Sequence, residues 1–160
     1  MSVWAALAGG FAGTLVLTTM MRAGSELRLT RIDLPFLLGS ALTTDRTRAK
    51  VLGYLLHFVA GQLFALAYYA LFVAIGHSGW WLGAVFGIAH ALFTGTALVS
   101  VLLPLLHPHM ATDLTSAPDV ALLESPGFLM LNYGLATPAV SLVAHVAYGT
   151  LVGGFVSLSQ

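Results

Sequence analysis

Charge is confined to two segments of this 160-residue chain, and this constrains the fold more than any other feature. All six basic residues lie between Arg22 and Lys50. The six acidic residues lie either in that same segment or between Asp113 and Glu124. The whole chain is 58% hydrophobic and only 8% charged. Soluble domains carry about 25% charged residues, so the sequence predicts an integral membrane protein.

Four apolar stretches are long enough to cross a membrane: 3–21, 48–75, 80–104 and 138–157. A helix rises about 1.5 Å per residue, so roughly 20 residues cross about 30 Å of hydrocarbon. We therefore predict an all-α, four-transmembrane-helix bundle that forms one domain over 1–160. The start of the chain lacks the basic residues of a signal peptide, so the first stretch is expected to be a retained span.

The positive-inside rule orients the predicted bundle. Every Arg and Lys lies at 22–50, so the two long loops, 22–47 and 107–137, are predicted to be cytoplasmic. Both termini then lie outside, and the protein is placed in the cytoplasmic (inner) membrane. The acidic residues share this side and predict exposed ion pairs between the loops, worth about 0–1 kcal/mol each. Zero net charge argues against nucleic acid as a partner.

Local signals predict a short interfacial helix in each loop. Residues 34–39 are apolar but too short to span, so they are expected to dip into the interface or to pack under the bundle. Thr44 or Asp45 is expected to cap the second span. Residues 125–131 begin with Ser-Pro, which is typical of a helix N-terminus and predicts a short helix there. The same signal, Thr-Pro at 137–138, is expected to open the last span.

Small residues recur every four positions along the predicted spans, and two of these stripes carry a histidine. One runs from Gly53 through His57, and the other runs from Ser141 through His145. A four-residue spacing puts these side chains on one helix face, and small residues let neighbouring backbones approach closely. The glycines expected to pack helices together are Gly9, Gly13, Gly53, Gly61, Gly83, Gly87, Gly149 and Gly153.

The order of span, charged loop, short apolar segment and His-bearing span occurs twice. It predicts a 2+2 parallel internal repeat with its axis along the membrane normal. His57 and His145 would then lie at matched depth, ~10–14 Å below the cytoplasmic boundary, and face each other. His90 would lie about 20 Å deep, offset towards the outside.

Three hypotheses account for these intramembrane histidines. In the first, His57 and His145 form a bis-His pair for haem b or bind a transition metal, with His90 as a third ligand. In the second, each histidine hydrogen-bonds to a neighbouring helix, which contributes ~0.6–2 kcal/mol. In the third, the histidines relay a proton or line a path for a small solute. Apart from Arg48 and Lys50 at the start of the second stretch, the predicted spans contain no charged residue, and no proline lies near the centre of a span, which disfavours ion-coupled transport.

A second group of metal-binding residue types follows the third span. His107, His109 and Met110 have the chemistry to capture a soft metal such as Cu(I). Histidine and proline at this position are more typical of a helix end, where the histidine complements the negative end of the helix dipole. We therefore favour a structural role for this segment.

The function expected from the sequence is that of a small polytopic membrane protein without a catalytic centre of its own. The chain has no cysteine, and its Ser, His and Asp residues show no catalytic spacing. Loops of this length are the natural surface for a protein partner. We predict an accessory or assembly subunit of a larger membrane complex, in contact with the lipid bilayer and with a protein partner or a second copy. The alternatives are a haem- or metal-binding electron-transfer protein and a transporter of protons or small solutes.

Overall fold

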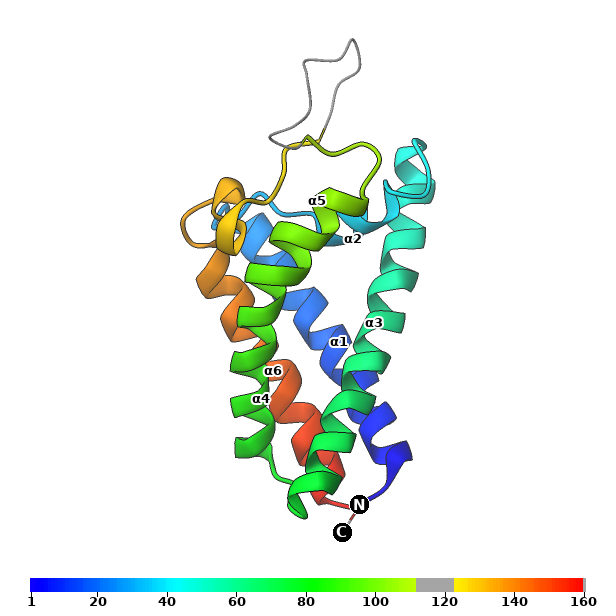
Figure 1. The fold of residues 1–160 in the computed structure, drawn as a ribbon, viewed down its shortest axis with the longest axis vertical. Helices are drawn as coiled ribbons and strands as arrows, with labels where there is room; N and C mark the ends of the chain where they lie inside the picture. The colour runs from blue at the N-terminus through cyan, green and yellow to red at the C-terminus, as the bar shows by residue number, and fades with distance from the viewer. Residues whose placement is uncertain (112–122, 160) are drawn as a thin grey trace.

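The computed structural model describes residues 1–111 and 123–159, and its regular structure in these residues is helical (Figure 1). The two ends of the chain meet at one end of the bundle, where the Ser2 backbone N–H donates to Ser159 Oγ over 2.9 Å. The two long connections lie at the other end. Four helices are long and apolar enough to cross a membrane: α1 (Val3–Glu26), α3 (Arg46–Ile75), the continuous segment Trp80–Leu106, and α6 (Thr137–Ser157). The predicted four-helix architecture is confirmed.

The third of these segments has wide turns in its second half. It consists of α4 (Trp80–Phe93), η1 (Thr94–Leu102), which is a π-helix, and α5 (Leu103–Leu106). Pro104 explains part of this geometry, because proline has no N–H and its ring collides with the carbonyl four residues earlier. The carbonyl in question is that of Ser100, inside η1. The sequence predicted spans without breaks, and the π-helix η1 corrects that expectation. π-turns are frequent at functional sites.

Glycines bring α4 and α6 into backbone contact. A Cβ added to Gly83 would overlap the carbonyl oxygen of Gly149, and a Cβ added to Gly149 would overlap that of Gly83. One turn further on, a Cβ at Gly87 would lie 2.5 Å from the carbonyl oxygen of His145. Only glycine fits at these positions, so the α4 and α6 backbones can approach this closely.

The other close crossings also depend on small residues. α1 packs against α6, where Gly9 faces Val152, and α1 crosses α3 where Gly61 meets the side chain of Thr14. The short helix α2 (Leu34–Gly39) lies across the start of α3, and Gly53 leaves space for the carbonyl of Pro35. The predicted short helix 34–39 therefore packs on the bundle.

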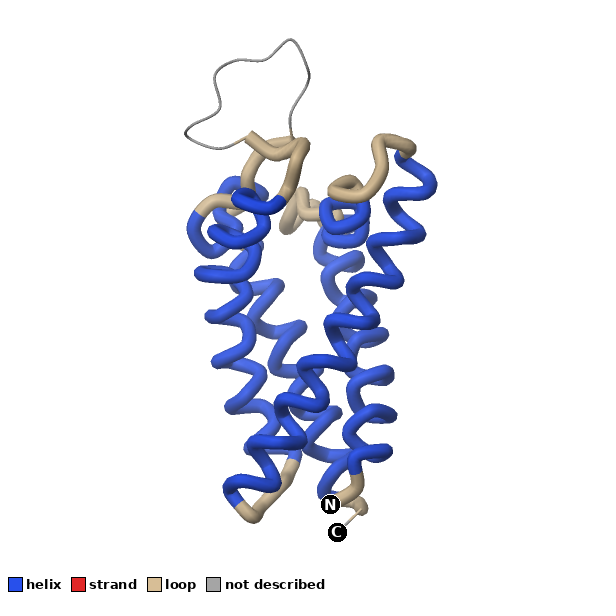
Figure 2. Tube along the Cα trace, turned by 45° about the vertical axis from the view of Figure 1, so that its right-hand side comes forward, coloured by secondary structure: helices blue, strands red, loops and turns tan. Residues whose placement is uncertain are grey.

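The helices α3 and α4 are kept apart by aromatic side chains. Starting from the turn at Gly76, the two helices diverge towards α2 and α5 (Figures 1 and 2). The rings of Phe64 and Phe93 lie 6.4 Å apart and those of Phe72 and Phe86 lie 5.2 Å apart, measured between centroids. A strict twofold repeat would pack α3 on α4 as closely as α1 on α6. The helix pairs differ in this respect, and the 2+2 repeat stays a prediction.

Two helix starts differ from the sequence expectation. The segment after Ser125-Pro126 is the 3-10 helix η2 (Phe128–Tyr133), not an α-helix that begins at the proline. Leu129 and Met130 there have positive φ angles of 51° and 60°, so the chain cannot continue as a regular α-helix. Thr137 does not cap α6, since its hydroxyl bonds elsewhere. The expected Asp45 cap of α3 is confirmed, because its carboxylate accepts the Arg48 N–H over 2.7 Å.

Candidate functional site

A cavity of about 300 Å³ lies between α1, α3, η1 and α6, at the level where α3 and α4 have diverged. We call it the histidine cavity, because His57, His90 and His145 all line it. The rest of its wall is mainly aliphatic, with side chains such as Leu17 and Leu98. The structure thus brings together the three histidines singled out in the sequence.

The imidazole of His145 is held by its own helix. Its Nδ1 lies 2.8 Å from the carbonyl oxygen of Ser141 and 3.3 Å from the Ser141 hydroxyl. A carbonyl oxygen only accepts hydrogen bonds, so Nδ1 carries the proton and donates it. Nε2 of His145 therefore keeps its lone pair.

The imidazole of His90 is the ring neighbour of His145. The two ring centroids are 4.7 Å apart in an edge-to-face arrangement. His90 Nδ1 lies 3.2 Å from the hydroxyl of Tyr68, and its ring stacks on Phe64 with centroids 3.7 Å apart. His90 was expected to be offset from the other two histidines along the membrane normal. It instead packs directly on His145, because the glycines of α4 and α6 bring their backbones together.

His57 and Thr94, which both line the histidine cavity, each carry a buried polar atom without a hydrogen-bond partner. Among the described residues, His57 Nε2 and Thr94 Oγ1 are the buried side-chain nitrogen and oxygen atoms that lack a hydrogen bond. Thr94 is only 8% exposed. Leaving a buried polar group unpaired costs about 1–3 kcal/mol, so a ligand or ordered water is expected to meet these atoms.

A second, smaller cavity of about 210 Å³ adjoins the first at the end of the bundle that carries the long loops. We call it the polar pocket. It shares His57 with the histidine cavity, together with three apolar residues. Two ion pairs, Arg22–Glu26 at 3.0 Å and Lys50–Asp33 at 3.3 Å, are formed by side chains in its wall.

The segment His107-Pro108-His109-Met110 fastens the second loop to the end of α2. His107 Nε2–H donates to the carbonyl oxygen of Leu37 over 3.1 Å, and His107 Nδ1 accepts the His109 backbone N–H over 3.1 Å. His109 Nδ1–H donates to the carbonyl oxygen of Ser40 over 3.0 Å. Burial lowers the pKa of His107. Both histidines thus cover carboxyl-terminal carbonyls of α2, and both nitrogens of His107 are engaged. Within the described ranges, no three His, Asp or Glu side chains are grouped as a metal site.

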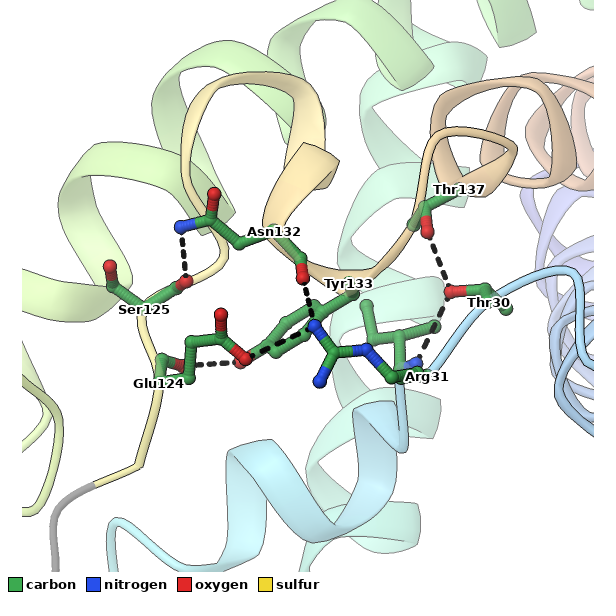
Figure 3. A network of polar contacts seen from close by, with 8 residues as sticks. Thr30, Arg31, Glu124, Ser125, Asn132, Tyr133 and Thr137 are labelled. Atoms are coloured by element: carbon green, nitrogen blue, oxygen red, sulfur yellow. Dashed lines mark hydrogen bonds and ion pairs between the residues drawn. The ribbon is translucent and has the colours of Figure 1, made fainter.

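The two long loops are joined by a network of polar contacts beside the start of α6 (Figure 3). The guanidinium of Arg31 lies 3.4 Å from the carboxylate of Glu124, and the Arg31 backbone N–H donates to the Tyr133 carbonyl over 2.7 Å. The hydroxyls of Thr30 and Thr137 are 2.7 Å apart. Burial raises the pKa of Tyr133 to about 12, with a further contribution from Glu124. The predicted pairing between loops is confirmed by this ion pair; Asp113 and Asp119 lie outside the described residues.

Comparison with protein-family models, with curated proteins and with solved structures found no match for this chain. Thr94 was not predicted as a site residue. The sequence does hold a signal for Thr94. It lies four residues after His90, on the same helix face, and ten residues before Pro104, which interrupts the helix.

Proposed function

We propose that this chain is a membrane protein that binds a small, mostly apolar molecule of the lipid phase in the histidine cavity. One observation carries the proposal: an apolar cavity of about 300 Å³ is lined by two residues, His57 and Thr94, that each have a buried polar atom without a partner, Nε2 and Oγ1. Ligand pockets are mainly apolar, measure about 300–1,000 Å³ and hold a few placed polar groups. The cavity meets this description at the lower end of the size range.

The lining limits the chemistry of the ligand. Among the described residues, no Asp, Glu, Lys or Arg lines the histidine cavity, so the part of the ligand inside it is neutral. Thr94 offers a hydroxyl that donates and accepts, and a neutral imidazole offers one donor and one acceptor. We infer a ligand portion that is hydrocarbon for most of its surface and carries one or two neutral oxygen atoms.

The proposed setting is the lipid bilayer, with both long loops on the cytoplasmic side. Its support is the apolar outer surface of the four long helices, for example Val59 and Leu63 on α3, which are 58% and 62% exposed. The confinement of all basic residues to one end supports the orientation. Cysteine labelling tests the orientation directly, because the chain has no native cysteine. If a cysteine added next to Arg46 reacts with a reagent supplied from outside, the orientation is the opposite of the one proposed.

The binding function is tested by comparing two variants of neighbouring residues on α3. Ala60→Phe puts a ring into the histidine cavity, which Ala60 lines, whereas Val59→Phe adds the same ring to the exposed face. The protein is purified in detergent, extracted with organic solvent and analysed by mass spectrometry. We expect a small molecule that co-purifies with the wild type and with Val59→Phe and is depleted in Ala60→Phe. Equal amounts in all three proteins, or none in any, would refute the proposal.

A haem or transition metal held by His57 and His145 is a second candidate for the same cavity. It is favoured by the bond from His145 Nδ1–H to Ser141, which leaves Nε2 free as a base, and by the unpaired Nε2 of His57. Visible spectroscopy and metal analysis distinguish the candidates. A Soret band that disappears in both His57→Ala and His145→Ala would support haem, and a colourless, metal-free protein would exclude haem and metal.

The accessory-subunit hypothesis concerns partners, and we retain it as a proposal compatible with ligand binding. The loop network around Arg31 and Glu124 would then form a fixed surface for a companion chain. Purification in mild detergent at native expression level tests it. Elution of this chain without a companion would count against an accessory role.

A further inference from the structure

The polar pocket and the histidine cavity together form one site with a charged end and an apolar end. They share the lining residues His57, Met21, Ile32 and Leu34, so the two cavities adjoin along these four side chains. Lys50 lies seven residues before His57 on α3, which is about 10 Å along a helix. The charged groups therefore lie towards the loop end of the bundle, and the three histidines lie deeper.

We propose that this site takes a membrane amphiphile with a zwitterionic phosphate–amine head group. The head group lies in the polar pocket, and the part of the hydrocarbon next to it lies in the histidine cavity. The inference rests on the proposed binding function and names the class of ligand. Its first support is direction: in the proposed orientation, the site changes from charged to apolar in the same sense as a lipid leaflet. A lipid can enter without turning over.

The charges of the polar pocket match a zwitterion. Its wall carries two cations, Arg22 and Lys50, and two carboxylates, Glu26 and Asp33. A phosphate meets the cations, because guanidinium and ammonium groups form charge-assisted hydrogen bonds to its oxygens. An amine then meets a carboxylate released from its ion pair, whereas a purely anionic head group would leave both carboxylates unpaired beside it.

The existing ion pairs are weak enough to be exchanged for contacts with a head group. The side chains of Arg22 and Glu26 are more than half exposed, and those of Lys50 and Asp33 are 40% and 46% exposed. Exposed pairs of this kind contribute little to stability. Binding therefore replaces weak pairs instead of breaking an essential contact of the fold.

His57 lines both cavities, so it lies beside the part of the ligand that joins the head group to the hydrocarbon. In a glycerolipid, ester carbonyls separate the ionic head group from the hydrocarbon chains. The Nε2–H tautomer of His57 donates to such an oxygen, which supplies the partner that this buried atom lacks. Thr94 lies beyond it in the histidine cavity and lacks a partner as well.

The test compares three lipids that share their acyl chains. Dilauroyl phosphatidylethanolamine, dilauroyl phosphatidylglycerol and dilauroylglycerol are added to the protein in a neutral detergent, and bound lipid is counted by native mass spectrometry. We expect the zwitterionic lipid to be retained at least about tenfold more than dilauroylglycerol, because two charge-assisted contacts distinguish them. Ala60→Phe should abolish retention of all three.

Charge variants connect the preference to the polar pocket. Arg22→Gln with Lys50→Gln should reduce the zwitterionic lipid to the level of dilauroylglycerol. Arg22→Lys with Lys50→Arg keeps both charges and should keep the preference, which separates loss of charge from loss of folding. Arg28→Gln with Arg48→Gln is the matched control, because neither residue lines the two cavities.

Each other outcome refutes a defined part of the reasoning. Preference for phosphatidylglycerol would overturn the zwitterionic assignment. Equal retention of the three lipids, blocked by Ala60→Phe, would overturn the head-group site but leave the proposed cavity function intact. Retention that is unaffected by Ala60→Phe would refute both proposals. No retention of any of the three lipids would refute the lipid proposal alone, because the cavity function is tested by the co-purified molecule.

Discussion

The contact between α4 and α6 yields the sharpest prediction about stability. Replacing Gly87 by Ala adds a methyl group 2.5 Å from the carbonyl oxygen of His145 and 2.8 Å from the Cα of Val146. Ordinary van der Waals contact begins at 3.4 Å, so the two backbones must separate by about 0.9 Å. Backbone atoms on both sides leave no flexible side chain to move aside.

The expected magnitude combines two opposing effects. Overpacking of this kind costs about 1–3 kcal/mol, and the change from Gly to Ala in a helix returns about 1 kcal/mol. Gly87→Ala should therefore lower the free energy of unfolding by roughly 1 kcal/mol. Gly154 provides the matched control on α6, since a Cβ there meets nothing within 4 Å. Gly154→Ala should gain about 0.5–1 kcal/mol.

The assay is thermal unfolding of both variants in one detergent, followed by circular dichroism. For a chain of this size, 1 kcal/mol shifts Tm by roughly 2–4 °C, so a difference of about 1.5–2 kcal/mol between the two variants should appear as roughly 3–8 °C. His90 and His145 move apart with their helices, so Gly87→Ala should also reduce the ligand retained in the histidine cavity. Gly87→Ala as stable as Gly154→Ala would show that α4 and α6 are not in backbone contact and would refute the packing argument.

Three further predictions concern the loop end of the bundle. Thr137→Val should lower the free energy of unfolding by about 1–3 kcal/mol, because the buried Thr30 hydroxyl loses its 2.7 Å partner; denaturant melts check this, and a loss below 0.5 kcal/mol would contradict it. Glu124→Gln should cost less than about 1 kcal/mol in the same melts, since its ion pair with Arg31 is exposed, and a larger loss would assign it a buried role. Burial lowers the pKa of His107 in the folded protein. The neutral imidazole therefore stabilises the loop in full above the unfolded-state pKa near 6.5. This contribution is lost as the pH falls from there towards the lower pKa of the folded state. The protection of the backbone amides at 34–40, measured relative to the intrinsic exchange rate at each pH, should therefore decrease from pH 7.5 to 5.5, and a His107→Gln variant with the same pH dependence would contradict this.

The sequence was sufficient for the architecture because its signals are local. Runs of apolar residues without charge predict spans, and the Asp45 cap and the Gly76 turn follow from nearest neighbours. The interior position of His57, His90 and His145 also followed, since helix periodicity places each on a face with small residues. These three residues line one cavity in the structure.

The details of the site required tertiary information. The periodicity of α3 and α4 does not say that Phe64 and Phe93 will hold these helices apart while glycines close α4 on α6. Nor does a local pattern show that Thr94 is left without a hydrogen bond at the start of η1. The helix expected after Pro126 failed for a related reason: Leu129 and Met130 adopt positive φ angles in a segment packed against η1.

The hydrogen bonds of the three histidines separate a packing role from a binding role. His145 bonds to Ser141 within its own helix, and His90 lies within hydrogen-bonding distance of Tyr68, so helix packing alone accounts for one nitrogen of each. His57 Nε2 has no such account, although it is buried, and the hydroxyl of Thr94 is in the same situation. Both residues line the histidine cavity. Packing alone requires neither this cavity nor two unpaired polar groups in its lining residues, and this supports the proposal that a ligand completes the bundle.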